Sequence, residues 1–457
     1  MLNPLVRIIV CVAFSATPSA ENPLAVDIGG SPPVPVLYEL GIDSVLASDS
    51  SITVLQESIM QWYLEEGYPF AGAGYYFASD DSLRVNTVPG RHALLEEVRI
   101  EGAPGTRSEI FTRLLAIETG DTYDREAVNT WIARIEQLKF IKAAGITELF
   151  LGEGGNIVIV QHVEKGRSGH FAASMDWHGD NLEGAGEILF LNLAGTAREL
   201  EISGQTTEWG GFNAYLRYRE PWLFGIPLSA QLEASQETPE SSWVNREGSL
   251  SVIWSIDRTE IMGGAGIWRG YPPDGERQKY DYGMGGIAFR TGHRVPQGWN
   301  GIEIRLEARS GNRTGQDSSG ILTIAELITD GNVYSGVMGF GGRLLTGGVM
   351  QGDWFEGLLE QLGGQETIRG YPENAFRAVR YAVARPEISL GETETRVYLF
   401  CDLAAIRTPE DGMRYPVGCG AGIRGMSGFF HADAAAGFPI QEGFGSARFY
   451  LRLTASI

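Results

Sequence analysis

The sequence predicts two small α/β modules followed by a sixteen-stranded antiparallel transmembrane β-barrel. Before residue 165, apolar residues recur with both helical and strand spacing, whereas segments of about ten alternating residues follow from residue 169 onward. The 457 residues include 61 Gly and 10% aromatic residues. This composition fits short strands and tight turns better than a helical bundle.

Residues 1–20 have the pattern of a secretory signal. Arg7 precedes the apolar stretch 8–14, and small residues continue to Ala20. Removal of this segment would take Cys11 with it and leave Cys401 and Cys419. These two form either a bridge between neighbouring strands or two small wall residues, and their number favours the second interpretation.

The first module is predicted over residues 34–90. A strand near 36–46 leads to a helix, and strands near 75–78 and 83–88 follow. The helix carries its apolar side chains on one face: Leu55, Ile59, Trp62 and Tyr63.

The second module is predicted over residues 91–165, with the order strand, helix, helix, strand, strand. Its first strand covers 94–102, and its last two lie near 147–151 and 157–163. Thr122 or Asp124 is suited to cap the longer helix. The apolar stripe of that helix is Val128, Trp131, Ile132, Ile135 and Leu138.

The barrel is predicted over residues 168–457. In "GIEIRLEAR" the apolar residues alternate with Glu and Arg, as expected for a wall between lipid and a wet lumen. We count eleven strands before a Gly-rich loop at 346–376 and five after it, with fourteen strands in total as the alternative. Each strand and loop then has about 18 residues, enough for a spanning strand of about 9–11.

The segment "LGGQETIRGYPENAF", 362–376, carries a single Arg within a polar loop. It resembles the sixth extracellular loop of the POTRA-barrel outer-membrane assembly and secretion factors, the bacterial surface antigen family. In that family the loop folds into the lumen, and its Arg meets an acidic residue on the thirteenth strand. The matching loop residues are Gly363, Gly364, Ile368, Arg369, Gly370 and Tyr371, and the wall residues are Phe400 and Asp402.

Further segments carry the same resemblance. "YREPWLFG" is similar to the turn after the family's fourth strand, and "GCGAGIRGMSGFFHADAA" to its hairpin of strands fourteen and fifteen. The order of elements in both modules resembles POTRA domains, although such modules could also be spacers. A second "RGYP", 269–272, lacks a preceding Gly pair, and we expect it to be a loop on the seventh strand.

The resemblance implies an outer-membrane factor that receives unfolded β-barrel clients on periplasmic POTRA modules and inserts them at a lateral seam. The alternative is a two-partner secretion transporter, which exports one large β-rich protein. That class usually carries a plug helix, which the proline-rich residues 21–35 cannot form. A porin-like channel is a third alternative, disfavoured because porins need no such modules.

The expected partners are unfolded outer-membrane or secreted β-rich proteins, the lipid bilayer, periplasmic chaperones and accessory lipoproteins. A net charge of −21 argues against nucleic acid as a partner. The sequence has no Gly-x-Ser-x-Gly elbow, His-Glu-x-x-His motif or phosphate loop. We therefore expect no enzyme activity, no metal and no other cofactor.

Overall fold

The structure is a computed structural model, and contacts within it divide the chain into two units after Gly166. The predicted signal segment, 1–20, lies outside the residues that the structure describes. The described residues are 23–29, 44–46, 49–79, 82–115, 118–152, 154–178, 181–206, 211–240, 243–256, 258–273, 275–295, 298–315, 319–392, 394–410 and 412–456.

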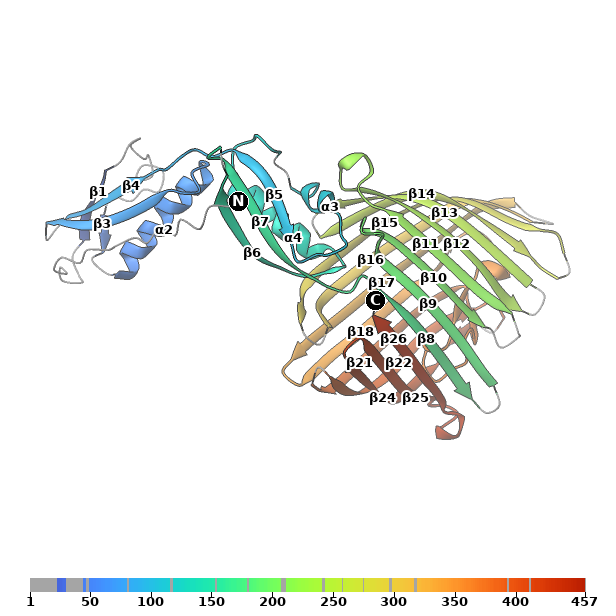
Figure 1. Ribbon diagram of the computed structural model, residues 1–457. Helices are drawn as coiled ribbons and strands as arrows, with labels where there is room; N and C mark the ends of the chain where they lie inside the picture. Colours follow the sequence, from blue (N-terminus) through green and yellow to red (C-terminus); the bar gives the residue numbers. More distant parts are fainter. Residues whose placement is uncertain are drawn as a thin grey trace. The chain divides into compact units, whose positions relative to one another are not determined.

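The first unit begins with a four-stranded sheet and one described helix, α2 (Asp49–Glu65) (Figure 1). The helix buries Leu55, Ile59 and Tyr63 against β4, as its stripe predicts. The sheet reaches further back than the predicted boundary at residue 34, because β1 pairs in parallel with β4. The strands, in the order β2, β1, β4, β3, are β2 (Ser44–Leu46), β1 (Pro23–Gly29), β4 (Ser82–Val88) and β3 (Gly72–Ser79).

A three-stranded sheet with two helices completes this unit. The Asp124 side chain caps α4 by accepting from the backbone N–H of Glu126 and Ala127. Trp131 is fully buried and donates to the Phe111 carbonyl at 2.7 Å. Among the described residues, no helix is long and apolar enough to span a bilayer. The elements are β5 (Leu95–Glu101), α3 (Ser108–Thr112), α4 (Arg125–Gln137), β6 (Ile141–Leu151) and β7 (Ile157–Lys165), with sheet order β5, β7, β6.

The second unit is a closed antiparallel barrel, which confirms the predicted architecture (Figure 1). Within the described residues it has sixteen strands, eleven before the inward loop and five after it, when the short β23 and β24 count as one interrupted strand beside β22. The strands are β8 (Gly169–His178), β9 (Asn181–Leu193), β10 (Arg198–Thr206), β11 (Phe212–Glu220), β12 (Leu228–Glu240), β13 (Trp243–Ile256), β14 (Thr259–Tyr271), β15 (Gln278–Val295), β16 (Gly298–Thr314), β17 (Ser319–Ser335), β18 (Met338–Gln351), β21 (Arg380–Gly391), β22 (Thr395–Thr408), β23 (Gly412–Arg414), β24 (Val417–Ser427), β25 (Phe430–Pro439) and β26 (Arg448–Ser456).

The alternation seen in the sequence sorts side chains between the two faces of the wall. On β16, Ile302, Ile304 and Leu306 are exposed on the outside, while Glu303 and Arg305 form ion pairs on the opposite face. The barrel closes where β26 pairs with β8, from Phe449 opposite Trp177 to Ser456 opposite His170. We call this closure the seam.

The height of the wall varies around the barrel. Strands β15, β16 and β17 have 18, 17 and 17 residues, and we call them the tall wall. At the seam, β25, β8 and β26 have only 10, 10 and 9 residues. Fewer backbone pairs therefore hold the seam than hold the tall wall together.

Three expectations about this unit need correction. The break predicted at residue 346 begins only after Gln351, because β18 continues to pair with β17 across a bulge between Val349 and Gln351. The second "RGYP" is no loop, since Trp268 and Arg269 lie within β14 and Trp268 is buried. Cys401 and Cys419 are register partners on β22 and β24 and form a disulfide, so the interpretation as separate wall residues is wrong.

Candidate functional site

The segment between β18 and β21 forms a hairpin that lies against the inner wall of the barrel. Its stem pairs β19 (Glu360–Leu362) with β20 (Phe376–Ala378), after a short 3-10 turn, η2 (Glu356–Leu358). Residues 363–375 form the tip. We call residues 352–379 the inward loop.

Two glycines shape the start of the tip. Gly363 and Gly364 have φ values of 131° and 80°, a conformation that other residues rarely adopt. Thr367 Oγ1 accepts from the Gly363 N–H and also donates to its carbonyl, both at 2.7 Å. Glu373 lies against Gly364 and accepts from the Gln365 N–H at 2.9 Å. These glycines therefore fold the tip on itself.

Arg369 and Asp402 form a bidentate ion pair inside the barrel. Arg369 Nε donates to Asp402 Oδ2 at 2.8 Å, and Nη2 donates to Oδ1 at 2.7 Å. The backbone N–H of Arg369 also donates to Oδ2, at 2.9 Å. Asp402 is 0% exposed. The carboxylate thus receives three hydrogen bonds from one residue, an arrangement that fixes both the position and the direction of the loop tip.

Three more residues of the wall surround the guanidinium. Its carbon lies 3.7 Å from the centre of the Phe400 ring, a cation–π contact. Glu387 on β21 accepts from Nη1 at 3.3 Å, and Arg385 on the same strand lies 3.5 Å from Asp402. Burial alone lowers the pKa of Arg369, but the hydrogen bonds and charge of Asp402 outweigh it and leave that pKa raised.

The loop tip approaches the wall so closely that two glycines have no room for a side chain and a third has little. A Cβ on Gly418 of β24 would lie 1.8 Å from the Arg369 carbonyl oxygen. A Cβ on Gly370 would lie 2.7 Å from the Phe438 backbone, and one on Gly437 would lie 3.1 Å from the Gly370 nitrogen. At this point the Gly370 N–H donates to the Tyr450 hydroxyl of β26 at 2.7 Å.

Ile368 and Tyr371 anchor the tip on either side of the Arg. Ile368 is fully buried in an apolar cluster with side chains of β18, β21 and β22. The Tyr371 hydroxyl donates to Gln441 at 2.8 Å and accepts from the Val417 N–H at 3.3 Å. The tip is therefore held by apolar packing, by an ion pair and by neutral hydrogen bonds together.

The sequence motif points to Arg369, Phe400 and Asp402, and the structure places these three side chains in contact. The motif does not point to Arg385, Glu387, Gly418 or Tyr450. The sequence does contain a signal for Gly418. It belongs to a Gly-rich hairpin, whose small residues leave room for another segment of the chain to pack against it. Tyr450 could be identified only as one of several polar residues on one face of the last strand.

Comparison with solved structures finds this fold in several other proteins. BamA from Haemophilus ducreyi lacking POTRA domains 1–3 matches with a TM-score of 0.59 at 14% identity, covering 95% of this chain and 100% of that one. CdiB from Acinetobacter baumannii matches with a TM-score of 0.59 at 13% identity, covering 100% and 93% of the two chains. CdiB from Escherichia coli matches with a TM-score of 0.59 at 13% identity, covering 98% and 93%.

No family model and no curated protein matches the sequence. At identities of 13–14%, the likeness to BamA and CdiB establishes a shared fold.

Proposed function

We propose that this chain is an assembly factor of the bacterial outer membrane, which inserts β-barrel clients at the seam between β26 and β8. The observation that supports the proposal is the construction of that closure. It joins two short strands, and the inward loop is docked on the wall beside it. Among the described residues, the closure has eight register pairs, against 17 and 14 within the tall wall, so its backbone ladder costs less to open than that of the tall wall.

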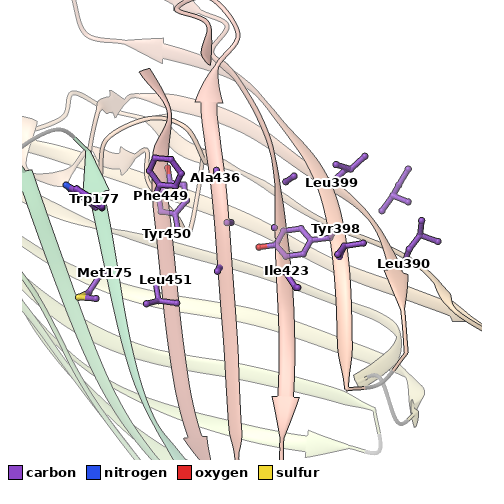
Figure 2. A pocket seen from close by; sticks show the side chains of 16 residues that line it. Met175, Trp177, Leu390, Tyr398, Leu399, Ile423, Ala436, Phe449, Tyr450 and Leu451 are labelled. Carbon is purple, nitrogen blue, oxygen red and sulfur yellow. The ribbon is translucent and has the colours of Figure 1, made fainter. Parts of the chain in front are cut away.

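The outer face at the seam is suited to a lipid environment. Phe449 lies opposite Trp177, and Leu451 lies opposite Met175, all on the outside of the barrel (Figure 2). Next to them, small side chains of β24 and β25 form the floor of an apolar groove of about 850 Å³. Opening the seam within such a layer leaves backbone N–H and C=O groups without water. A client strand would satisfy them, which drives templating without a nucleotide or metal.

The two α/β modules, 34–90 and 91–165, act in this proposal as periplasmic POTRA modules that receive unfolded clients. Within the described residues, β3 lies at one edge of its sheet and β6 at one edge of the other. An extended segment can add a strand at such an edge through main-chain hydrogen bonds. Chaperones and accessory lipoproteins are the expected partners at this stage.

A locked seam tests the insertion mechanism. Ala173 and Leu453 are register partners across the seam, so cysteines there can form a disulfide. We expect the oxidised double variant to lose client assembly and to regain it on reduction. The matched control places cysteines at Ile202 and Leu216, which pair β10 with β11, two strands of 9 residues each. Full activity of a verified seam lock would contradict the proposal.

The alternative function is secretion of one large β-rich protein through the lumen. A secretion transporter would tolerate the seam lock, because its client does not leave between β26 and β8. Depletion of the protein separates the two functions independently. An assembly factor should lower several unrelated outer-membrane barrels together, whereas loss of one secreted protein with unchanged barrels would identify a transporter.

A further inference from the structure

Three successive lumen-facing residues of the last strand have polar side chains that contact other elements. These residues are Arg448, Tyr450 and Arg452, at alternate positions of β26. Arg448 and Tyr450 are buried, and Arg452 is half-buried. Their strand, β26, is the one that pairs with β8 to form the seam.

Two of the three hold the inward loop. The Tyr450 hydroxyl accepts from the Gly370 N–H at 2.7 Å, next to the Arg369 pair. Arg452 Nη1 donates to Glu366 of the loop at 3.0 Å. The last strand is therefore attached to the loop at two points, one on each side of Arg369 in the sequence.

Two of the three also hold strands on the other side of the seam. Arg448 Nε donates to Asp176 of β8 at 3.1 Å, and Glu183 of β9 lies 3.9 Å from Arg448 Nη2. Arg452 Nη2 donates to Glu187 of β9 at 3.2 Å. Arg452 thus contacts the loop with one nitrogen and the far side of the seam with another.

We propose that Arg448, Tyr450 and Arg452 couple docking of the inward loop to closure of the seam, so that the loop acts as a latch. Separating β26 from β8 and β9 breaks the pair of Arg448 with Asp176 and the pair of Arg452 with Glu187, so opening the seam loses two ionic contacts of buried or half-buried groups. A docked loop supports the closed arrangement because Glu366 and Gly370 fix the side chains that make those pairs. These residues are positioning residues of the assembly mechanism, and their role in client insertion depends on the function proposed above.

Coupling of this kind is reciprocal. If loop docking favours a closed seam, a closed seam favours loop docking by the same factor. The test therefore needs two measurements on the full-length protein in phospholipid vesicles without any client. The first is the rate of protease cleavage within the loop. The second is the rate of disulfide formation between cysteines placed at Ala173 and Leu453.

The variants are Arg452→Ala and Tyr450→Phe, with Arg290→Ala as the matched control. Arg290 faces the lumen from β15, and its side chain contacts Glu303 and the Trp299 ring. We expect Arg452→Ala to raise loop cleavage and slow seam disulfide formation, each by about fivefold or more. Tyr450→Phe should move both rates in the same directions by less, and Arg290→Ala should move neither. Heat-dependent gel migration verifies that each variant forms the barrel.

The decisive step repeats loop cleavage after the seam disulfide has formed. We expect the locked seam to return the cleavage rate of Arg452→Ala and Tyr450→Phe part of the way toward that of the locked parent, because the direct bonds to Glu366 and Gly370 stay lost. A cleavage rate that ignores the lock, or a variant that changes only one of the two rates, would overturn the latch. Because no client is present, this result is independent of the seam-lock assay of assembly, so either proposal can fail alone.

Discussion

The tall wall and the seam use charged side chains in different ways. On the tall wall, Arg290 and Glu303 are 45% and 35% exposed and lie 3.6 Å apart. At the seam, Arg448 and Asp176 are each 7% exposed. Long strands are held by longer backbone ladders, so a pair such as Arg290 and Glu303 can stay half-exposed to a wet lumen. Short strands have fewer backbone pairs, and buried side-chain contacts supply part of the closure.

If buried ion pairs hold their elements more firmly than half-exposed ones, Arg369→Ala should have the largest effect on docking of the inward loop. The change leaves Asp402 buried without its main partner, and breaking a buried pair typically costs about 3–5 kcal/mol. Arg290→Ala removes a half-exposed pair and should cost about 0–1 kcal/mol. The measurement is protection of the inward loop from protease in intact cells, together with client assembly.

The controls for Arg369 sharpen the same contrast. Arg369→Lys should rescue only part of the docking, since Lys lacks the planar fork that meets both Asp402 oxygens. Arg269→Ala, in the second "RGYP", should leave the loop protected, because Arg269 pairs with Asp281 on the neighbouring strand. Loop release by Arg269→Ala with none by Arg369→Ala would show that Arg269, and not Arg369, holds the inward loop.

A charge introduced on the outer face should have the next largest effect. Its cost in unfolding free energy should differ between the tall wall and the seam. Leu306→Arg on β16 places a charge on an exposed apolar residue of the tall wall, where a charge at mid-membrane costs about 2–4 kcal/mol. Ala455→Arg lies one residue before the end of a short strand, so its Arg reaches polar headgroups and should cost about 0–1 kcal/mol. Urea unfolding of vesicle-inserted protein measures both, and equal costs would contradict the comparison.

A steric change on β24 tests docking of the inward loop without altering any charged group. Gly418→Ala places a Cβ 1.8 Å from the Arg369 carbonyl oxygen and should weaken docking by about 1–3 kcal/mol. Gly425→Ala, on the same strand, is the control because its nearest non-neighbour atom is 4.0 Å away. Protease cleavage of the loop should rise for Gly418→Ala alone, and a similar rise in both variants would point to a defect of β24 itself.

Loop docking should also depend on pH. Burial raises the pKa of Glu373 from 4.5 to about 7, the Gln365 N–H opposes this, and Asp176 and Glu183 add repulsion. A group whose pKa is raised binds its proton more tightly in the docked state. Docking should therefore weaken as pH rises from about 4.5 to about 7 and change little above that range.

Cleavage of the loop measured at about pH 5 and about pH 8 checks this sign. Glu373→Gln keeps the shape of the side chain without a titrating group. We expect the variant to lose the difference between the two conditions. A dependence of the same size in Glu373→Gln would assign it to another group.

Several features were predictable because the sequence encodes them locally. Alternation in "GIEIRLEAR" separates the two faces of β16 directly, and the apolar stripe of α4 locates Val128 and Trp131 in the core. The strand count also follows from local alternation, which allowed the correct placement of Asp402 on the thirteenth strand. The loop motif pointed to Arg369 through resemblance to a family.

Other features depend on which distant residues meet, and sequence spacing carries no such information. Arg448 and Asp176 are 272 residues apart, and only barrel closure brings them together. The Gly pair 347–348 is typical of a break, but tertiary pairing extends β18 past it. Residues 23–29 contain a proline and lie before the predicted start of the first module at residue 34, whereas in the structure they pair with β4.

The disulfide between Cys401 and Cys419 has a consequence for the order in which the molecule is assembled. The bond spans 18 residues and also restricts the unfolded chain, which stabilises the fold by roughly 3 kcal/mol in the chain-entropy account. It joins positions adjacent to Asp402 and Gly418, which are themselves register partners. A chain oxidised before it enters the membrane already holds these two residues opposite each other. The receptor for Arg369 is then built into the unfolded chain, and the loop docks on a surface that exists before the barrel closes.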